Sequence, residues 1–166
     1  MIVILWTYIG FYLVGAVTDF LWLRIPNPLV VALFLLFWVA VYQSPRDVSL
    51  LAHVLPALVL FLLSAGVFVF GKFGAADVKL LTVTGLWVGY DVLPWFLVAL
   101  GLGGFMIFML YQYARPTVEW AAIRVQGIFG HADFLPASIQ DRKNLPYGVV
   151  IALAAIAVAN DLPFFQ

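Results

Sequence analysis

The sequence predicts an all-α protein, a polytopic membrane helix bundle with about six transmembrane helices. Of its 166 residues, 66% are hydrophobic and only 10% are charged, and the mean hydropathy is +1.11. Soluble domains carry about 25% charged residues, so this composition indicates an integral membrane protein. The apolar runs are continuous and lack the alternation of barrel strands, which favours helices as the spanning elements.

The expected spans follow one another along the whole chain and leave no room for a separate soluble domain. They are Met1–Leu23, Pro28–Tyr42, Leu50–Phe70, Gly74–Tyr90, Val92–Tyr113 and Leu145–Ala159. Several are shorter than the roughly 20 residues of a full span, which indicates a thin or tilted arrangement. The first has no Lys or Arg before its apolar run, so we expect it to remain as a span rather than be removed as a signal peptide.

Prolines and glycines support these bounds. Pro26 and Pro28 follow the first run and Pro146 opens the last, where a missing N–H costs nothing at a helix start. Gly85 and Gly89 form a GxxxG pattern in the fourth run, which predicts close contact with another helix. Beyond the fifth run, the amphipathic stretch 117–126 predicts a separate helix at the membrane surface.

The basic residues predict the orientation in the membrane. Seven of the eight follow the first, third or fifth run: Arg24, Lys72, Lys79, Arg115, Arg124, Arg142 and Lys143. Only Arg46 belongs to the opposite set. Because cytoplasmic loops retain Lys and Arg, both termini are expected on the non-cytoplasmic side. The basic residues are scattered and the net charge is zero, so no nucleic-acid partner is expected.

Two aspartates, Asp19 and Asp77, lie at the edges of apolar runs, each followed closely by a basic residue (Arg24 and Lys79). A carboxylate near lipid is costly unless a cavity, a partner or a proton relieves it. The charge bias places both aspartates toward the cytoplasmic face. Two carboxyl groups that meet in a semi-dry cleft need not ionise together, and an aspartic hydrolase uses that state. The structural alternative is that Asp19 pairs with Arg24 while Asp77 is an ordinary loop acid.

Small residues precede Asp77, so backbone or substrate can approach its carboxyl group closely. Lys79 is two residues further on and points to a different helix face, so it is poorly placed to neutralise Asp77. His131 and Asp133 have a metal-like HxD spacing but no third ligand nearby, and the chain has no cysteine, so no metal site is expected.

Three segments together resemble a known family: Asp19 with RIPN (Arg24–Asn27), GAADVKLL around Asp77, and LPYG (Leu145–Gly148). In order and spacing they are similar to the type IV prepilin peptidases, membrane aspartyl proteases of the GxGD type. The resemblance covers nearly the whole chain, so residues 1–166 are expected to form one prepilin-peptidase-like transmembrane domain. The short length most resembles the compact branch that serves tight-adherence (Flp-type) pili.

The resemblance implies a multi-pass enzyme of the bacterial inner membrane, whose partners are the lipid bilayer and a prepilin or pseudopilin with a transmembrane helix. It would cleave the basic leader at the cytoplasmic face and so support pilus assembly or secretion. The cysteine-rich insertion and large early loop of the bifunctional relatives are missing, so neither methyltransferase activity nor a cofactor is expected. The oligomeric state is left open.

The implied catalytic pair is Asp19 and Asp77. Supporting or substrate-cleft residues are implied at Arg24, Pro26, Asn27, Gly74, Ala76, Lys79, Pro146, Tyr147 and Gly148. Arg24 and Asn27 would fix the loop beside Asp19, and Lys79 would anchor its span at the headgroups or raise the local positive potential. Ala76 replaces the second glycine of the family motif, and its methyl group would narrow the approach to Asp77.

Two other readings remain open. Intramembrane aspartyl proteases of the presenilin or signal-peptide-peptidase kind carry a YD motif and an intact GxGD, whereas Asp19 follows Thr18 and Asp77 follows Ala76. A non-enzymatic multi-pass scaffold or carrier is the second. Carriers usually show paired repeats and acids near the middle of the membrane, and this chain has neither pattern.

Overall fold

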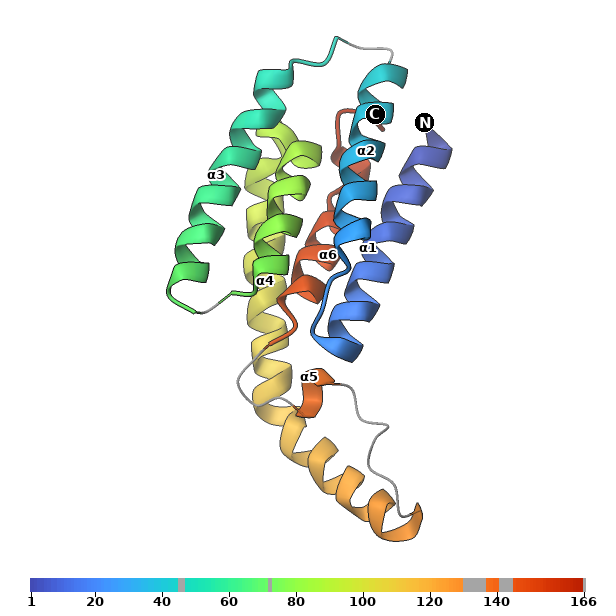
Figure 1. Cartoon of the computed structure of the whole chain (residues 1–166), viewed down its shortest axis with the longest axis vertical. Helices are drawn as coiled ribbons and strands as arrows, with labels where there is room; N and C mark the ends of the chain where they lie inside the picture. The colour runs from blue at the N-terminus through green and yellow to red at the C-terminus, as the bar shows by residue number, and fades with distance from the viewer. Residues whose placement is uncertain (45–46, 72, 130–136, 141–144, 166) are drawn as a thin grey trace.

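The fold is a bundle of helices, seen here in a computed structural model that describes residues 1–44, 47–71, 73–129, 137–140 and 145–165. Its elements are α1 (Ile2–Trp22), α2 (Asn27–Gln43), α3 (Leu50–Val69), α4 (Ala75–Phe129), α5 (Ala137–Gln140), α6 (Tyr147–Ala157) and the 3-10 helix η1 (Ala159–Asp161) (Figure 1). The described residues contain no strand, which confirms the all-α prediction.

Helix α4 consists of two arms that turn back on one another at Gly89 (Figure 1). Gly89 has φ 63° and ψ −176°, a conformation that is essentially restricted to glycine. Leu81 from the first arm and Leu97 from the second line the same groove, as expected for arms that lie side by side. The arms correspond to the runs Gly74–Tyr90 and Val92–Tyr113, which the sequence predicts as separate spans.

One sequence interpretation of this region is confirmed and one needs correction. Both glycines of the GxxxG pattern contact α3, because an added Cβ would lie 2.6 Å from the Ala57 Cα at Gly85 and 2.9 Å from the His53 ring at Gly89, and Gly89 also forms the turn. The stretch 117–126 is not a separate helix: the second arm continues through it to Phe129 and projects beyond the bundle (Figure 1).

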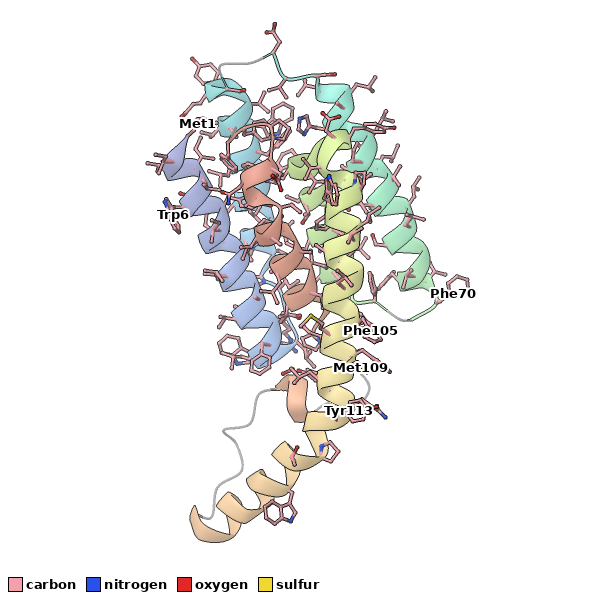
Figure 2. The ribbon with its side chains drawn as sticks, turned by 180° about the vertical axis from the view of Figure 1, so that it is seen from behind. Met1, Trp6, Phe70, Phe105, Met109 and Tyr113 are labelled. Carbon is pink, nitrogen blue, oxygen red and sulfur yellow. The ribbon has the colours of Figure 1, made fainter. Side chains whose placement is uncertain are left out.

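Within the part of the chain that the structure describes, three helices are long and apolar enough to cross a membrane: Ile2–Trp22, Leu50–Val69 and Ala75–Tyr113. Large apolar side chains such as Trp6 and Phe105 point away from the bundle and are 67% and 60% exposed (Figure 2). An exposed apolar surface of this kind suits a lipid environment. The chain is therefore a multi-pass membrane protein, while the count of six spans stays a prediction.

Both chain ends lie at one end of the bundle, and the connections after α1 and α3 lie at the other (Figure 1). This arrangement is compatible with the orientation that the charge bias predicts. Four of the counted basic residues, Arg46, Lys72, Arg142 and Lys143, lie outside the described residues.

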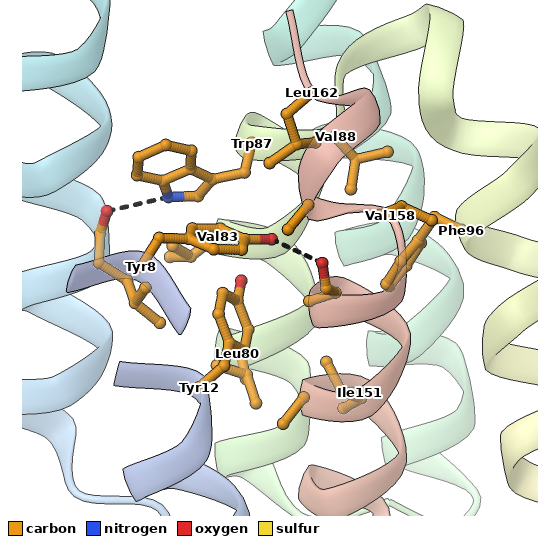
Figure 3. Close-up of a cluster of buried hydrophobic side chains, with 14 of the residues drawn as sticks. Tyr8, Tyr12, Leu80, Val83, Trp87, Val88, Phe96, Ile151, Val158 and Leu162 are labelled. Atoms are coloured by element: carbon orange, nitrogen blue, oxygen red, sulfur yellow. Dashed lines mark hydrogen bonds between the residues drawn. The ribbon is translucent and has the colours of Figure 1, made fainter. Parts of the chain in front are cut away.

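Buried aromatic side chains with satisfied polar atoms join the helices at the centre of the bundle (Figure 3). The Tyr8 hydroxyl of α1 donates to the Ala155 carbonyl of α6 at 3.2 Å. The Trp87 indole of α4 donates to the Leu33 carbonyl of α2 at 3.1 Å. Because unpaired polar atoms are costly in an apolar interior, these bonds favour one register between the helices.

His53 of α3 supports the turn between the arms of α4. Its buried imidazole lies against Gly89, where an added Cβ would come within 2.9 Å of the ring. Its Nδ1 lies 2.6 Å from the Leu86 carbonyl, which can only accept, so Nδ1 carries the donated hydrogen. The imidazole thus bonds to a carbonyl near the end of the first arm, where helical partners are lost.

We predict that Gly89→Ala destabilises the fold by about 1–3 kcal/mol, because alanine tolerates the positive φ poorly and its methyl group would press on His53. The measurement is the thermal unfolding midpoint of the purified protein in detergent. Gly66→Ala is the control, since nothing lies within 4 Å of a Cβ at that position of α3. Equal midpoints for Gly89→Ala and the wild type would contradict the prediction.

Candidate active site

Asp77 lies in the first turn of α4, not in a loop as the structural alternative assumed, and its side chain is buried. It is the third residue of the helix, and its Oδ2 accepts a hydrogen bond from the Gly74 N–H at 3.0 Å. An acid at this position that reaches back to the residue before the helix is one half of a capping box. The GAAD segment therefore forms the start of α4 and also holds the Asp77 carboxyl group in place.

Asp19 lies in the last turn of α1 and faces the start of α6. The carboxyl group is buried, with 5% of the residue exposed, and its Oδ2 accepts a hydrogen bond from the Val149 N–H at 3.2 Å. The first N–H groups of a helix have no partner within it, so they bind anions readily. The α6 start, opened by Pro146, thus supplies the donor that Asp19 needs.

Gly148 fits closely between Asp19 and the RIPN segment. A Cβ at this position would lie 2.8 Å from both the Asp19 Cγ and the Ile25 Cδ1. Real Cβ atoms essentially never come that close to other atoms. Only glycine therefore allows α6 to approach the carboxyl group as closely as it does. This close approach explains why a glycine ends the LPYG segment.

The register between α1 and the first arm of α4 brings Asp19 and Asp77 to the same level. The two helices run in opposite directions (Figure 1). Two turns away from the aspartates, the hydroxyl groups of Tyr12 and Thr84 meet at 2.7 Å. Asp19 is seven residues after Tyr12 and Asp77 is seven before Thr84 (19 − 12 and 84 − 77), so equal lengths of helix lead from that contact to each carboxyl group. The two carboxyl groups are close enough for their charges to interact.

Neither carboxylate is neutralised by a cation among the described residues. Arg24 is exposed and makes no ion pair with Asp19, so the structural alternative for Asp19 is wrong. Lys79 is also exposed, and its Nζ donates to the Asn27 Oδ1 at 3.1 Å. This contact, which the sequence interpretation missed, joins the start of α2 to α4, and Asp77 has no lysine partner among the described residues.

The remaining predicted site residues lie around this pair. Pro26 is the residue before α2, and Tyr147 is the first residue of α6. The Tyr147 ring contacts the ring of Phe73, with centroids 4.8 Å apart. Phe73 was not among the predicted site residues. Its position as an aromatic residue directly before the GAAD segment could have identified it. Ala76 packs against the hydrophobic core.

The described residues contain no group of three His, Cys, Asp or Glu side chains that could hold a metal ion. His131 and Asp133 of the HxD pattern lie outside the described residues. His53 lies at the Gly89 turn, far along α4 from Asp77. The arrangement therefore offers two buried carboxyl groups, held by backbone amides, as its reactive groups.

Comparison with known proteins found one family. The model of the type IV leader peptidase family matches residues 6–109, a stretch that includes Asp19, the RIPN segment and Asp77. The LPYG segment lies beyond this match. No match was found among curated proteins or among solved structures.

We predict that Gly148→Ala lowers the rate of leader-peptide cleavage on the order of 100-fold, because its methyl group would displace the Asp19 carboxyl group and small misplacements of a reacting group are costly. The measurement is the cleavage rate of a leader-bearing substrate by purified protein. Gly10→Ala in α1, with nothing within 4 Å of its Cβ, is the matched control. Cleavage by Gly148→Ala at the control's rate would exclude a precise role for this contact.

Proposed function

The chain belongs to the type IV leader peptidase family, and from this premise we propose that it is an aspartic endopeptidase that removes the basic leader from a type IV or Flp-type prepilin or pseudopilin. The carrying observation is that Asp19 and Asp77 are both buried at one level of the bundle with no cation beside them among the described residues. The family match favours leader-bearing substrates over those of presenilin-like proteases.

In the proposed reaction the two aspartates share the work of acid and base. One ionised carboxylate takes a proton from a water molecule, whose oxygen attacks the carbonyl carbon of the scissile peptide bond. The other carboxyl group is protonated, polarises the carbonyl oxygen and then gives its proton to the leaving amine. Water is consumed, the C–N bond breaks, and a new carboxyl group and a new amine leave the site.

The backbone amides at Gly74 and Val149 hold the carboxyl groups in place for this reaction. Preorganised donors of this kind do not need to rearrange during the reaction, unlike water. Gly74 and Gly148 keep the surroundings of the two carboxyl groups free of side-chain bulk. The proposed supporting residues therefore hold the carboxyl groups and leave space around them, and they take no part in the bond-making steps.

The proposed location is the bacterial inner membrane, with six spans, the active site facing the cytoplasm and both termini on the other side. The bias of Lys and Arg supports this orientation. The two arms of α4, separated at Gly89, support counting them as two spans. A basic leader that stays in the cytoplasm would then meet the aspartates at the cytoplasmic boundary, as leader removal for pilus assembly or secretion requires.

We predict that Asp19→Asn and Asp77→Asn each lower prepilin cleavage by roughly 10²–10⁴-fold, because each removes one member of an acid–base pair. The measurement is the conversion of a co-expressed prepilin to its mature form on a gel. Asp47→Asn is the control, since Asp47 is exposed in the connection before α3. All three variants should accumulate in the membrane like the wild type. Normal maturation by either single variant of the pair would rule out the aspartic mechanism.

We predict that the two ends of α3 are labelled from opposite sides of the membrane. The chain has no cysteine, so Ser49→Cys and Phe70→Cys, both at exposed positions flanking α3, each provide a single reactive thiol. In spheroplasts a membrane-impermeant maleimide should label Ser49→Cys at once and Phe70→Cys only after permeabilisation. The reverse pattern would place the aspartates on the outer face and overturn the proposed orientation.

A further inference from the structure

An apolar groove of about 260 Å³ runs between the second arm of α4 and the start of α6. Its lining includes Leu97 and Gly101 of the second arm, Val150 of α6 and Leu81 of the first arm. Pockets that enclose small ligands have volumes of roughly 300–1,000 Å³. This groove is smaller and open along its side, so it suits a partner that lies against it and inserts side chains.

Two residues that line the groove are direct neighbours in sequence of the glycines that contact the aspartates. The groove includes Phe73 and Tyr147, whose rings are in contact. Phe73 directly precedes Gly74, whose N–H binds Asp77, and Tyr147 directly precedes Gly148, which lies against Asp19. A chain that lies in the groove and continues past this aromatic pair therefore arrives at the two carboxyl groups.

We propose that this groove is the docking surface for the apolar helix of the substrate, the segment that follows the scissile bond. This inference rests on the proposed function and adds where the substrate binds. The aromatic pair marks the point where the docked helix ends and the extended leader junction enters the site.

The wall residues fit a helix better than a lipid chain. Nothing lies within 4 Å of a Cβ built at Gly101, so the wall is open at that point and a partner backbone can approach closely. Close backbone approach at small residues is how helices associate in membranes, where packing replaces the hydrophobic effect. A flexible lipid chain has no need for such an approach and would not be guided to the carboxyl groups.

The test uses Gly101→Leu, which places a branched side chain on the groove wall at a position where nothing lies within 4 Å of the Cβ. Two substrates are compared: a full-length type IV prepilin in detergent and a short peptide that spans the leader junction but lacks the apolar helix. We expect Gly101→Leu to lower kcat/KM for the prepilin by roughly tenfold or more while cleavage of the peptide stays within about twofold of the wild type.

Gly66→Leu is the matched control, because Gly66 is also an exposed helical glycine with nothing within 4 Å of its Cβ, but it lies on α3 outside the groove. It should cleave both substrates like the wild type. Unchanged prepilin cleavage by Gly101→Leu would overturn the docking proposal alone. A wild type that cleaves the short peptide as efficiently as the prepilin would do the same. A wild type that cleaves neither would refute the proposed function, and the docking proposal with it.

A second measurement does not depend on how well the leucine variant folds. A photoreactive residue at Leu97, on the groove wall, is compared with one at Leu62, which is 60% exposed on α3. Both are placed in the Asp77→Asn variant, so that the prepilin stays intact, in vesicles of phosphatidylethanolamine and phosphatidylglycerol. We expect crosslinks to the prepilin's apolar helix from position 97 only. Crosslinks from position 97 to lipid alone would assign the groove to lipid and overturn the proposal.

Discussion

Two buried carboxyl groups, with no cation beside them among the described residues, are the constraint on which the rest of this structure depends. In an apolar bundle a carboxylate is costly unless charge-assisted hydrogen bonds replace its water. Here both donors come from helix starts: the Gly74 N–H at α4 binds Asp77, and the Val149 N–H at α6 binds Asp19. The starts of α4 and α6 must therefore lie at the same end of the bundle, beside the last turn of α1.

The core of the bundle fixes the register that this geometry needs. The Tyr12–Thr84 contact joins α1 to the first arm of α4, two turns from the aspartates, and the Tyr8–Ala155 bond joins α1 to α6. A shift of either helix by one residue would break these buried bonds and also move Asp19 away from its partners. The polar contacts that stabilise the core therefore also set the positions of the two aspartates.

The helices and the two candidate aspartates could be predicted from the sequence, because apolar runs and acids beside them are local patterns. The runs predicted most helix bounds to within a few residues, although the second arm of α4 continues beyond its run to Phe129, and the two aspartates were predicted to act as a pair. Three features depended on contacts between distant segments and could not be read locally. These are the support of the Gly89 turn by His53, the bond from Lys79 to Asn27, and the clash that excludes a Cβ at Gly148. The GxxxG spacing predicts that both glycines contact another helix, but it does not show that Gly89 also reverses the chain.

The alanine that replaces the second motif glycine is compatible with the geometry of the site. Ala76 packs against the hydrophobic core in the first turn of α4, where glycine would weaken the helix by about 1 kcal/mol. The glycine that the chain retains is the sterically demanding one, since a Cβ at Gly74 would lie 3.2 Å from the Asp77 Oδ2. Space is therefore tight before the helix, where the backbone N–H meets the carboxylate, and a Cβ at Gly74 would make that carboxylate move by a few tenths of an ångström. Alanine at position 76 strengthens the turn that holds Asp77 and leaves that hydrogen bond in place.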